Sequence, residues 1–311
     1  MRIAVIGQAA FGAKSLESLL EKGENIVAAY APPDRPGGKR DPLAEAASAR
    51  GIPLFQPASF KDDRVFSDFR AFEPDLAILA FVTAIIPPRY FEACSRGAIC
   101  YHPSLLPRRR GASAINWAVA LGDERTGLTI FWPDGGIDTG PILLQKEVEI
   151  GPEDTTGSLY FNHLFPMGIE AIRESVDLIR RGAAPKIPQP AEGASYEPIF
   201  DDRWAGVDWN KPGREICNLI RGCDPQPGAY VNWMGGKVRL HGAKFSPATG
   251  ESGPPGALLE LGAGAVRIAV PGGELTIEKV RAAGVGKISA SAFAAGAGFR
   301  IGDFFGEKSH A

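Results

Sequence analysis

The chain opens with Met1-Arg-Ile-Ala-Val-Ile-Gly7, a short apolar run that ends in glycine. The run predicts a buried strand that enters a tight turn at Gly7. Leucines at positions 16, 19 and 20 predict a helix directly after it, because this spacing places side chains on one helix face. Further apolar runs predict strands over residues 26–30, 52–55, 76–81, 98–101, 128–132 and 142–148. Strands separated by helices are typical of the α/β class, with a doubly wound, mainly parallel sheet covered on both faces.

The second part of the chain has a different pattern. We predict one long amphipathic helix from Thr156 to about Arg181, followed by a proline-rich linker. A further helix is predicted over 214–221. Short apolar runs split by glycine then predict a small OB-like β-barrel, over 238–240, 257–261, 265–270 and 275–280. The expected domains are residues 1–182 and 203–311, joined by a linker over 183–202.

Size and composition exclude several classes of protein. A chain of 311 residues with 44% hydrophobic residues fits two domains with full cores. The net charge of −2 gives no sign of general nucleic-acid affinity. The 13 basic and 9 acidic residues from Arg203 onward fit weak polyanion binding, but such an excess also arises without function. The four cysteines form no CxxC pair, so we expect neither a metal site nor disulfides.

The opening residues lack the layout of a secretion signal, and no apolar stretch approaches the roughly 18 residues of a membrane span. We therefore expect a cytoplasmic protein that does not enter membranes. The segment Gly7-Gln-Ala-Ala-Phe-Gly12 does not have the GxGxxG spacing, and no GxxxxGK[ST] motif occurs. Hydride transfer and nucleotide hydrolysis are thus disfavoured.

His102 is the first candidate for acid–base chemistry. It ends the predicted strand over 98–101 and opens the proline-stiffened turn Pro103-Ser-Leu-Leu-Pro107. Ligands bind beyond the carboxyl ends of strands in such sheets, and an imidazole transfers protons near neutral pH. The alternative is a histidine that only caps the strand. The other histidines, His163, His241 and His310, are expected to be structural or solvated.

Asp138 is the second candidate. It lies in the glycine-rich turn Asp134-Gly-Gly-Ile-Asp-Thr-Gly140, where a carboxylate can orient an imidazole. The alternative is an aspartate that closes its own turn. The run Arg108-Arg-Arg-Gly111 is a candidate for binding an acidic ligand, or else a solvated surface. No serine or cysteine has a nucleophile-elbow context, so covalent catalysis is not expected.

Two motifs carry a family resemblance. His102-Pro-Ser-Leu-Leu-Pro-Arg-Arg-Arg-Gly-Ala-Ser-Ala-Ile-Asn-Trp117 resembles the SLLPxxRG signature of the 10-formyltetrahydrofolate-dependent formyltransferases, and Ile137-Asp-Thr-Gly140 resembles their second motif. The stretch Ile220-Arg-Gly-Cys-Asp-Pro-Gln-Pro-Gly-Ala-Tyr230 is similar to the start of their carboxyl-terminal domain. Within the family, Leu164-Phe-Pro and Pro188-Gln-Pro-Ala-Glu-Gly-Ala-Ser-Tyr196 are most similar to the hydrolase domain of 10-formyltetrahydrofolate dehydrogenase. Methionyl-tRNA formyltransferases are the next most similar branch.

The resemblance implies a folate site and a catalytic pair. The pteridine ring is expected under Phe81–Pro87 and the Leu105-Leu-Pro107 turn, with Arg110 near the acidic tail. His102 would assist proton transfer and stabilise the formyl oxygen, while Asp138 orients it. The residues so implied for binding 10-formyltetrahydrofolate or tetrahydrofolate are Phe81, Ile85, Ile86, Pro87, Ser104, Leu105, Leu106, Pro107 and Arg110. No metal is implied.

Two departures from the family pattern bear on the acceptor of the formyl group. Many members have asparagine two residues before the histidine. This chain has Cys100 at that position, and the hydrolase-like branch also lacks the asparagine. Positions 100 and 102 of a strand share a face, so Cys100 is expected to line the site as a small wall with a weak donor. Losing a good oxyanion donor costs on the order of 10²–10³ in rate. The loop Pro32–Asp41 is compact, whereas tRNA formyltransferases have a longer basic loop there.

These features favour water or a small amine as acceptor. The alternatives are initiator methionyl-tRNA, a sugar-nucleotide amine, or a folate-binding module without turnover.

Overall fold

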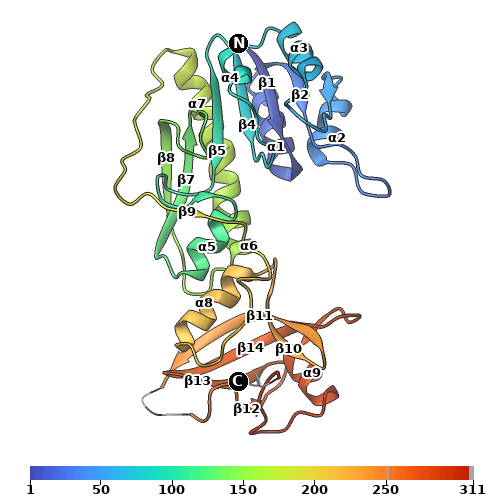
Figure 1. Ribbon diagram of the computed structural model, residues 1–311, viewed down its shortest axis with the longest axis vertical. Coiled ribbons are helices and arrows are strands. Elements are labelled where there is room, and N and C mark those ends of the chain that lie inside the picture. Colours follow the sequence, from blue (N-terminus) through green and yellow to red (C-terminus); the bar gives the residue numbers. More distant parts are fainter. Residues whose placement is uncertain (249, 251, 308–311) are drawn as a thin grey trace. The chain divides into compact units, whose positions relative to one another are not determined.

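The computed structural model describes residues 1–248, 250 and 252–307. Its first sheet begins with five parallel strands. These are β1 (Arg2–Gly7), β2 (Asn25–Tyr30), β3 (Leu54–Phe55), β4 (Leu76–Ala80) and β5 (Ala98–His102). β7 (Arg125–Phe131) runs antiparallel to β5, and β8 (Ile142–Glu149) completes the order β3-β2-β1-β4-β5-β7-β8. The sheet is therefore mainly parallel, which confirms the predicted α/β class (Figure 1).

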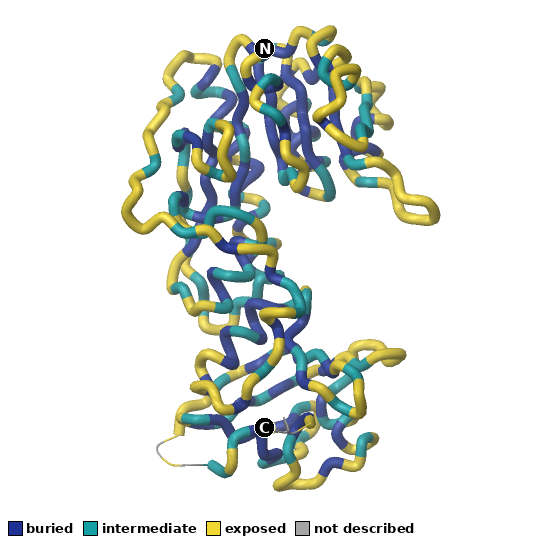
Figure 2. The backbone as a smooth tube through the Cα atoms, viewed as in Figure 1, coloured by how far each residue is buried: buried dark blue, intermediate teal, exposed yellow. Residues whose placement is uncertain are grey.

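Helices cover both faces of this sheet, because its strands are apolar on both sides. The side chains of Val5, Ile78 and Ile99 form one core with α1 (Ala9–Glu21), α2 (Pro42–Ala49) and α7 (Phe165–Arg180). Alternate strand residues face a second core with α3 (Asp63–Ala71) and α4 (Arg89–Glu92). Figure 2 shows these strands buried and the connecting loops exposed.

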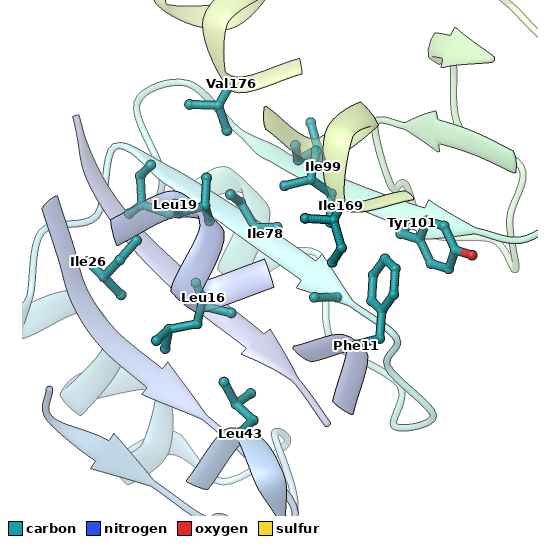
Figure 3. Packing of buried hydrophobic residues seen from close by; sticks show 14 of the residues in the cluster. Phe11, Leu16, Leu19, Ile26, Leu43, Ile78, Ile99, Tyr101, Ile169 and Val176 are labelled. Atoms are coloured by element: carbon teal, nitrogen blue, oxygen red, sulfur yellow. The ribbon is translucent and has the colours of Figure 1, made fainter. Parts of the chain in front are cut away.

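Two close approaches fix how the helices join the strands. A Cβ atom on Gly7 would lie 2.4 Å from the carbonyl oxygen of Ala80, so glycine is required where β1 turns into α1 beside β4. Gly168 of α7 meets the rings of Phe11 and Tyr101, which stack with centroids 4.2 Å apart (Figure 3). Helix α7 thus packs directly on α1 and β5, the strand that carries His102.

The prediction of one continuous helix from Thr156 to about Arg181 is wrong, because this stretch is interrupted. The structure has α6 (Thr156–Leu159), a π-helical turn over Tyr160–Leu164, and then α7. Pro166 lies in the first turn of α7, and proline has no N–H for the regular bond to the preceding turn. Phe161 lies in this π-helical turn and is 64% exposed.

The described chain divides into two compact units. The first consists of Met1–Gly111, Gly127–Val148 and Phe161–Tyr196, and the second of Ala112–Thr126, Glu149–Tyr160 and Glu197–Ala311. The second unit therefore also contains two segments that precede the linker in sequence, including α5 (Ala114–Ala120) and α6.

The second unit is built on an antiparallel sheet of the order β10-β11-β14-β13-β12, with β15 paired to β14. Its strands are β10 (Ala229–Trp233), β11 (Gly236–Pro247), β12 (Leu258–Leu261), β13 (Val266–Val270), β14 (Gly273–Arg281) and β15 (Lys287–Ser289). Helix α8 (Gly213–Cys223) packs Ile216 and Ile220 into the core of this sheet. α9 (Ala290–Gly296) covers it with Ala290 and Ala294. This confirms a separate, small antiparallel domain.

Four helices, α3, α4, α5 and α9, are absent from the sequence prediction. All four are short, with nine residues in α3, four in α4 and seven each in α5 and α9, so each shows too few turns of a helical pattern to stand out in the sequence. The short strands β6 (Arg110–Gly111) and β9 (Tyr196–Glu197), which pair with each other, also lack a pattern, since two residues cannot show alternation.

Candidate active site

His102 lies at the carboxyl end of β5, and both of its ring nitrogens have partners. Its Nε2 lies 2.8 Å from the carbonyl oxygen of Arg109, and its Nδ1 lies 3.5 Å from Oδ2 of Asp138. Because a carbonyl can only accept, Nε2 carries a proton and donates it. The imidazolium form, with a proton on each nitrogen, satisfies both contacts at once. The ring thus contacts two separate loops, at Arg109 and at Asp138.

Asp138 reaches His102 from a loop with a left-handed backbone, at φ 55°. Its Oδ2 also accepts a hydrogen bond from the backbone N–H of Gly111 at 2.8 Å. The turn-closing role belongs to Asp134, whose Oδ1 accepts from the N–H of Gly136 and the hydroxyl of Thr139. The two predicted candidates, distant in sequence, are thus brought together.

Cys100 shares a sheet face with His102. It is half-buried and packs against the core of α3 and α4, whereas Tyr101 between them belongs to the opposite core. Burial raises the pKa of the Cys100 thiol, and the negative charge of Asp138 raises it further. The thiol is therefore neutral near pH 7, which is the form expected of a wall residue and not of a nucleophile.

The segment after β4 presents a mixed surface. Phe81 has a left-handed φ of 63° and is half-buried, as is Pro87. Ile85 is 76% exposed, which is unusual for a large apolar side chain, whereas Ile86 is buried in the core of α3 and α4. β4 and β5 are adjacent and parallel, so their carboxyl ends lie at the same edge of the sheet. The segment Phe81–Pro87 begins at the end of β4, and His102 lies at the end of β5.

The turn after His102 is held by internal hydrogen bonds. The hydroxyl of Ser104 donates to the carbonyl of Arg108 at 2.8 Å. Thr129 donates to the carbonyl of Ser104 and accepts from the N–H of Leu106, whose own carbonyl accepts from Gln145. Ser104 and Leu106 are buried, and the half-buried side chains of this turn are Pro103, Leu105 and Pro107.

The three arginines differ in their surroundings. Arg108 is exposed, whereas Arg109 and Arg110 are half-buried. The backbone N–H of Arg109 donates to Oγ of Ser195 at 2.9 Å. The guanidinium of Arg110 donates from Nε and Nη2 to Oε1 of Gln189, at 3.1 and 2.7 Å.

Sequence reasoning missed the contribution of the linker residues Gln189 and Ser195. They contact the loops of both motifs, yet they lie in a proline-rich segment without periodicity. A polar side chain between two prolines was the available signal. The carbonyl of Arg109 gives no signal at all, since every residue has one.

Among residues 1–248, 250 and 252–307 there is no group of three or more His, Cys, Asp or Glu side chains arranged to hold a metal ion. No helix in this part of the chain has both the length and the apolar character needed to cross a membrane.

Two family descriptions match the chain. Residues 1–167 match the formyl transferase domain, and residues 203–298 match the formyl transferase C-terminal domain. Mitochondrial 10-formyltetrahydrofolate dehydrogenase of Mus musculus is 42% identical over 260 residues, which cover 82% of this chain and 28% of the relative. The chain thus spans less than a third of that relative's length.

Two further proteins match along nearly their whole length. Methionyl-tRNA formyltransferase of Symbiobacterium thermophilum is 35% identical over 98% of this chain and 95% of its own. The crystal structure of an N-formyltransferase from Helicobacter canadensis, in complex with folinic acid and dTDP-3-aminofucose, has the same fold. Its TM-score is 0.70 at 18% identity, covering 90% of this chain and 100% of that one. The chain belongs to the formyl transferase family of enzymes.

Proposed function

We propose that the protein transfers the formyl group of 10-formyltetrahydrofolate to water or a small amine and releases tetrahydrofolate. The observation that carries this proposal is the contact of His102 with Asp138 at 3.5 Å, with the other ring nitrogen hydrogen-bonded to a carbonyl oxygen. The name of the Mus musculus relative and the folinic acid bound by the Helicobacter canadensis enzyme support a folate as formyl donor.

The pteridine ring is proposed to bind at the ends of β4 and β5. The accessible apolar side chains there are Phe81, Ile85, Pro87, Leu105 and Pro107. Ile86, Ser104 and Leu106 are buried, so their part is to shape the backbone that contacts the ring. Arg110 is proposed near the acidic tail of the folate, with its guanidinium oriented by Gln189.

The chemistry follows from the two nitrogens of His102. A lone pair of the acceptor attacks the formyl carbon, and negative charge develops on the formyl oxygen. The Nε2–H of His102 donates to that oxygen, in the place that the Arg109 carbonyl oxygen holds here. Asp138 stabilises the imidazolium and helps to take the acceptor's proton. When the tetrahedral intermediate collapses, the bond from carbon to N10 breaks, N10 takes a proton, and water as acceptor yields formate.

Two features support water or a small amine as acceptor. Cys100 supplies only a weak donor beside the formyl oxygen. The loop Pro32–Asp41 is compact and only weakly basic, with Arg35, Lys39 and Arg40 against Asp34 and Asp41. Arg40 lies 3.8 Å from Asp34, and the loop is hydrogen-bonded to Gln56.

Initiator methionyl-tRNA is the second candidate acceptor. The observation that favours it is the match to a methionyl-tRNA formyltransferase over 95% of that enzyme's length, second domain included. A sugar-nucleotide amine and a folate-binding module without turnover are further candidates.

Incubation with 10-formyltetrahydrofolate, first alone and then with charged initiator tRNA, separates these functions. We expect tetrahydrofolate and formate to form without tRNA. Consumption that depends on tRNA would replace this proposal with the second candidate. Binding without consumption, in the presence of water, amines and tRNA, would contradict turnover altogether.

A further inference from the structure

Gln189 is a half-buried residue between two exposed prolines of the linker, Pro188 and Pro190. Its amide nitrogen donates to the carbonyl oxygens of Asp138 and Gly140, each at 2.8 Å. Its Oε1 accepts two hydrogen bonds from Arg110. An amide offers two N–H donors and two lone pairs on its oxygen, so every hydrogen-bonding position of Gln189 is used.

The two carbonyls held by Gln189 belong to the loop that presents Asp138. Asp138 has a left-handed backbone at φ 55°, a conformation that residues other than glycine adopt uncommonly, although aspartate is among those that tolerate it. Glycine is required at position 140, because a Cβ there would lie 1.8 Å from the carbonyl oxygen of Trp132. The hydrogen bonds from Gln189 therefore hold two peptide planes of a tightly constrained turn.

The same segment also holds the loop of the first motif. Ser195 accepts from the N–H of Arg109 through Oγ and from the N–H of Arg110 through its carbonyl oxygen. The linker residues 189–195 thus fix both the carboxylate that faces Nδ1 of His102 and the backbone that faces Nε2.

We infer that Gln189 is a positioning residue that sets the direction of the Asp138 carboxylate toward His102, and so sets the rate of formyl transfer. The inference rests on the proposed function for its kinetic test. It assigns a catalytic purpose to a segment that otherwise only joins two parts of the chain. A purely structural Gln189 would affect folding and leave kcat unchanged.

Two variants separate these roles. Gln189→Glu has the same length and keeps an acceptor for Arg110, but it has no donor for the carbonyls of Asp138 and Gly140. We expect kcat to fall about 10- to 100-fold, the range expected when a catalytic group is misplaced by about 1 Å. KM for 10-formyltetrahydrofolate should stay within about threefold of its value in the unaltered protein. Gln189→Ala introduces no charge and should lower kcat similarly.

Gln56→Ala is the matched control. Gln56 also donates its amide to a backbone carbonyl, that of Pro32, but on a different loop. We expect its kcat to equal that of the unaltered protein. Thermal unfolding is measured for all variants. Unchanged kcat in both Gln189 variants, or a loss of kcat that Gln56→Ala reproduces, would overturn the inference.

A second readout does not depend on turnover. The ring ¹⁵N signals of His102, assigned by comparison with His102→Gln, report its protonation and hydrogen bonding. Gln189→Ala should shift these signals and leave those of His241 unchanged, whereas unchanged His102 signals would overturn the inference. If the unaltered protein turns over no 10-formyltetrahydrofolate with any acceptor, the proposed function fails, and these signals still decide the role of Gln189.

Discussion

The first and second units each contain a buried histidine in contact with an aspartate. In the first unit, His102 lies 3.5 Å from Asp138. In the second, Nδ1 of His241 lies 3.0 Å from Oδ1 of Asp224, and Lys287 lies 3.6 Å from the same oxygen. The two rings are similarly buried, at 6% and 2% exposure. By distance and burial alone, the second pair is the better formed.

The difference lies in the other ring nitrogen. Nε2 of His102 donates to the carbonyl oxygen of Arg109, a loop residue whose own backbone φ is 58°. Nε2 of His241 is buried and has no hydrogen-bond partner among the residues that the structure describes. A substrate carbonyl can replace a loop carbonyl, but it cannot reach an enclosed nitrogen. We therefore assign a stabilising role to the pair in the second unit, and the pair in the first unit is the one that we propose for catalysis.

The largest expected effect tests this contrast directly. His102→Ala should reduce kcat/KM for 10-formyltetrahydrofolate by about 10³-fold or more, because general acid–base catalysis supplies about 10²–10⁴. The unfolding midpoint should change by only a few degrees. Near-normal turnover with a normal midpoint would remove His102 from the mechanism.

Asp138→Asn should have the next largest effect. Asparagine keeps the size of the side chain and an oxygen for the N–H of Gly111, but it removes the charge that faces His102. We expect kcat to fall on the order of 10²–10³-fold. Steady-state kinetics of the folate reaction measures this, and a loss below threefold would show that the carboxylate's charge is not used.

His241→Ala should reverse the pattern, with lost stability and an unchanged kcat at 25 °C. It removes the hydrogen bond between the imidazole and the Asp224 carboxylate, and removing one member of a buried hydrogen-bonded pair costs about 1–3 kcal/mol. The unfolding midpoint of the second unit should fall by several degrees. A loss of kcat with normal stability would make the second pair catalytic and break the comparison.

The pH dependence of stability sharpens the same contrast. Burial raises the pKa of Asp224, but the hydrogen bond and charge of His241, with smaller contributions from the charge of Lys287 and the backbone N–H of Gly242, together hold the pKa below its ordinary value of 3.8. A lowered carboxyl pKa stabilises the fold above 3.8, and this stability is lost as the pH falls toward the lowered value. Denaturant unfolding between pH 6 and pH 3 should show a smaller acid-induced loss in His241→Ala. An identical loss would mean that the pair is not the source.

Cys100→Ala should have the smallest effect on rate. The thiol's pKa is raised by burial and by the charge of Asp138, so it is not a nucleophile, and kcat should change less than about fivefold. A loss of about 10³-fold in Cys100→Ala, together with a thioester trapped on Cys100 of the unaltered protein, would contradict this.

Much of the fold follows from local pattern, and the exceptions have physical causes. The apolar runs at β1, β2 and β4 are buried on both faces, so their composition alone indicates them. The run at β7 looks the same, but composition does not say that it is antiparallel to β5. The helix over 156–181 has continuous apolar spacing, and the effect of Pro166 on hydrogen bonding interrupts it.

The site was predictable only in its titratable residues. His102 and Asp138 stand out because each is a titratable side chain in or beside a loop that follows a predicted strand, but spacing alone did not show that they meet. Gln189 and the carbonyl of Arg109 act through amide and backbone groups, which carry no chemical signature in a sequence. Their roles depend on tertiary placement.

A crystal structure with a non-hydrolysable 10-formyl folate analogue tests the central assignment most directly. We predict that the formyl oxygen takes the Nε2–H of His102 at a hydrogen-bond distance of about 2.8–3.0 Å, that the Arg109 carbonyl moves off this nitrogen, and that Asp138 stays beside Nδ1. A bound analogue whose formyl group lies away from His102, with the Arg109 carbonyl still on Nε2, would contradict the account.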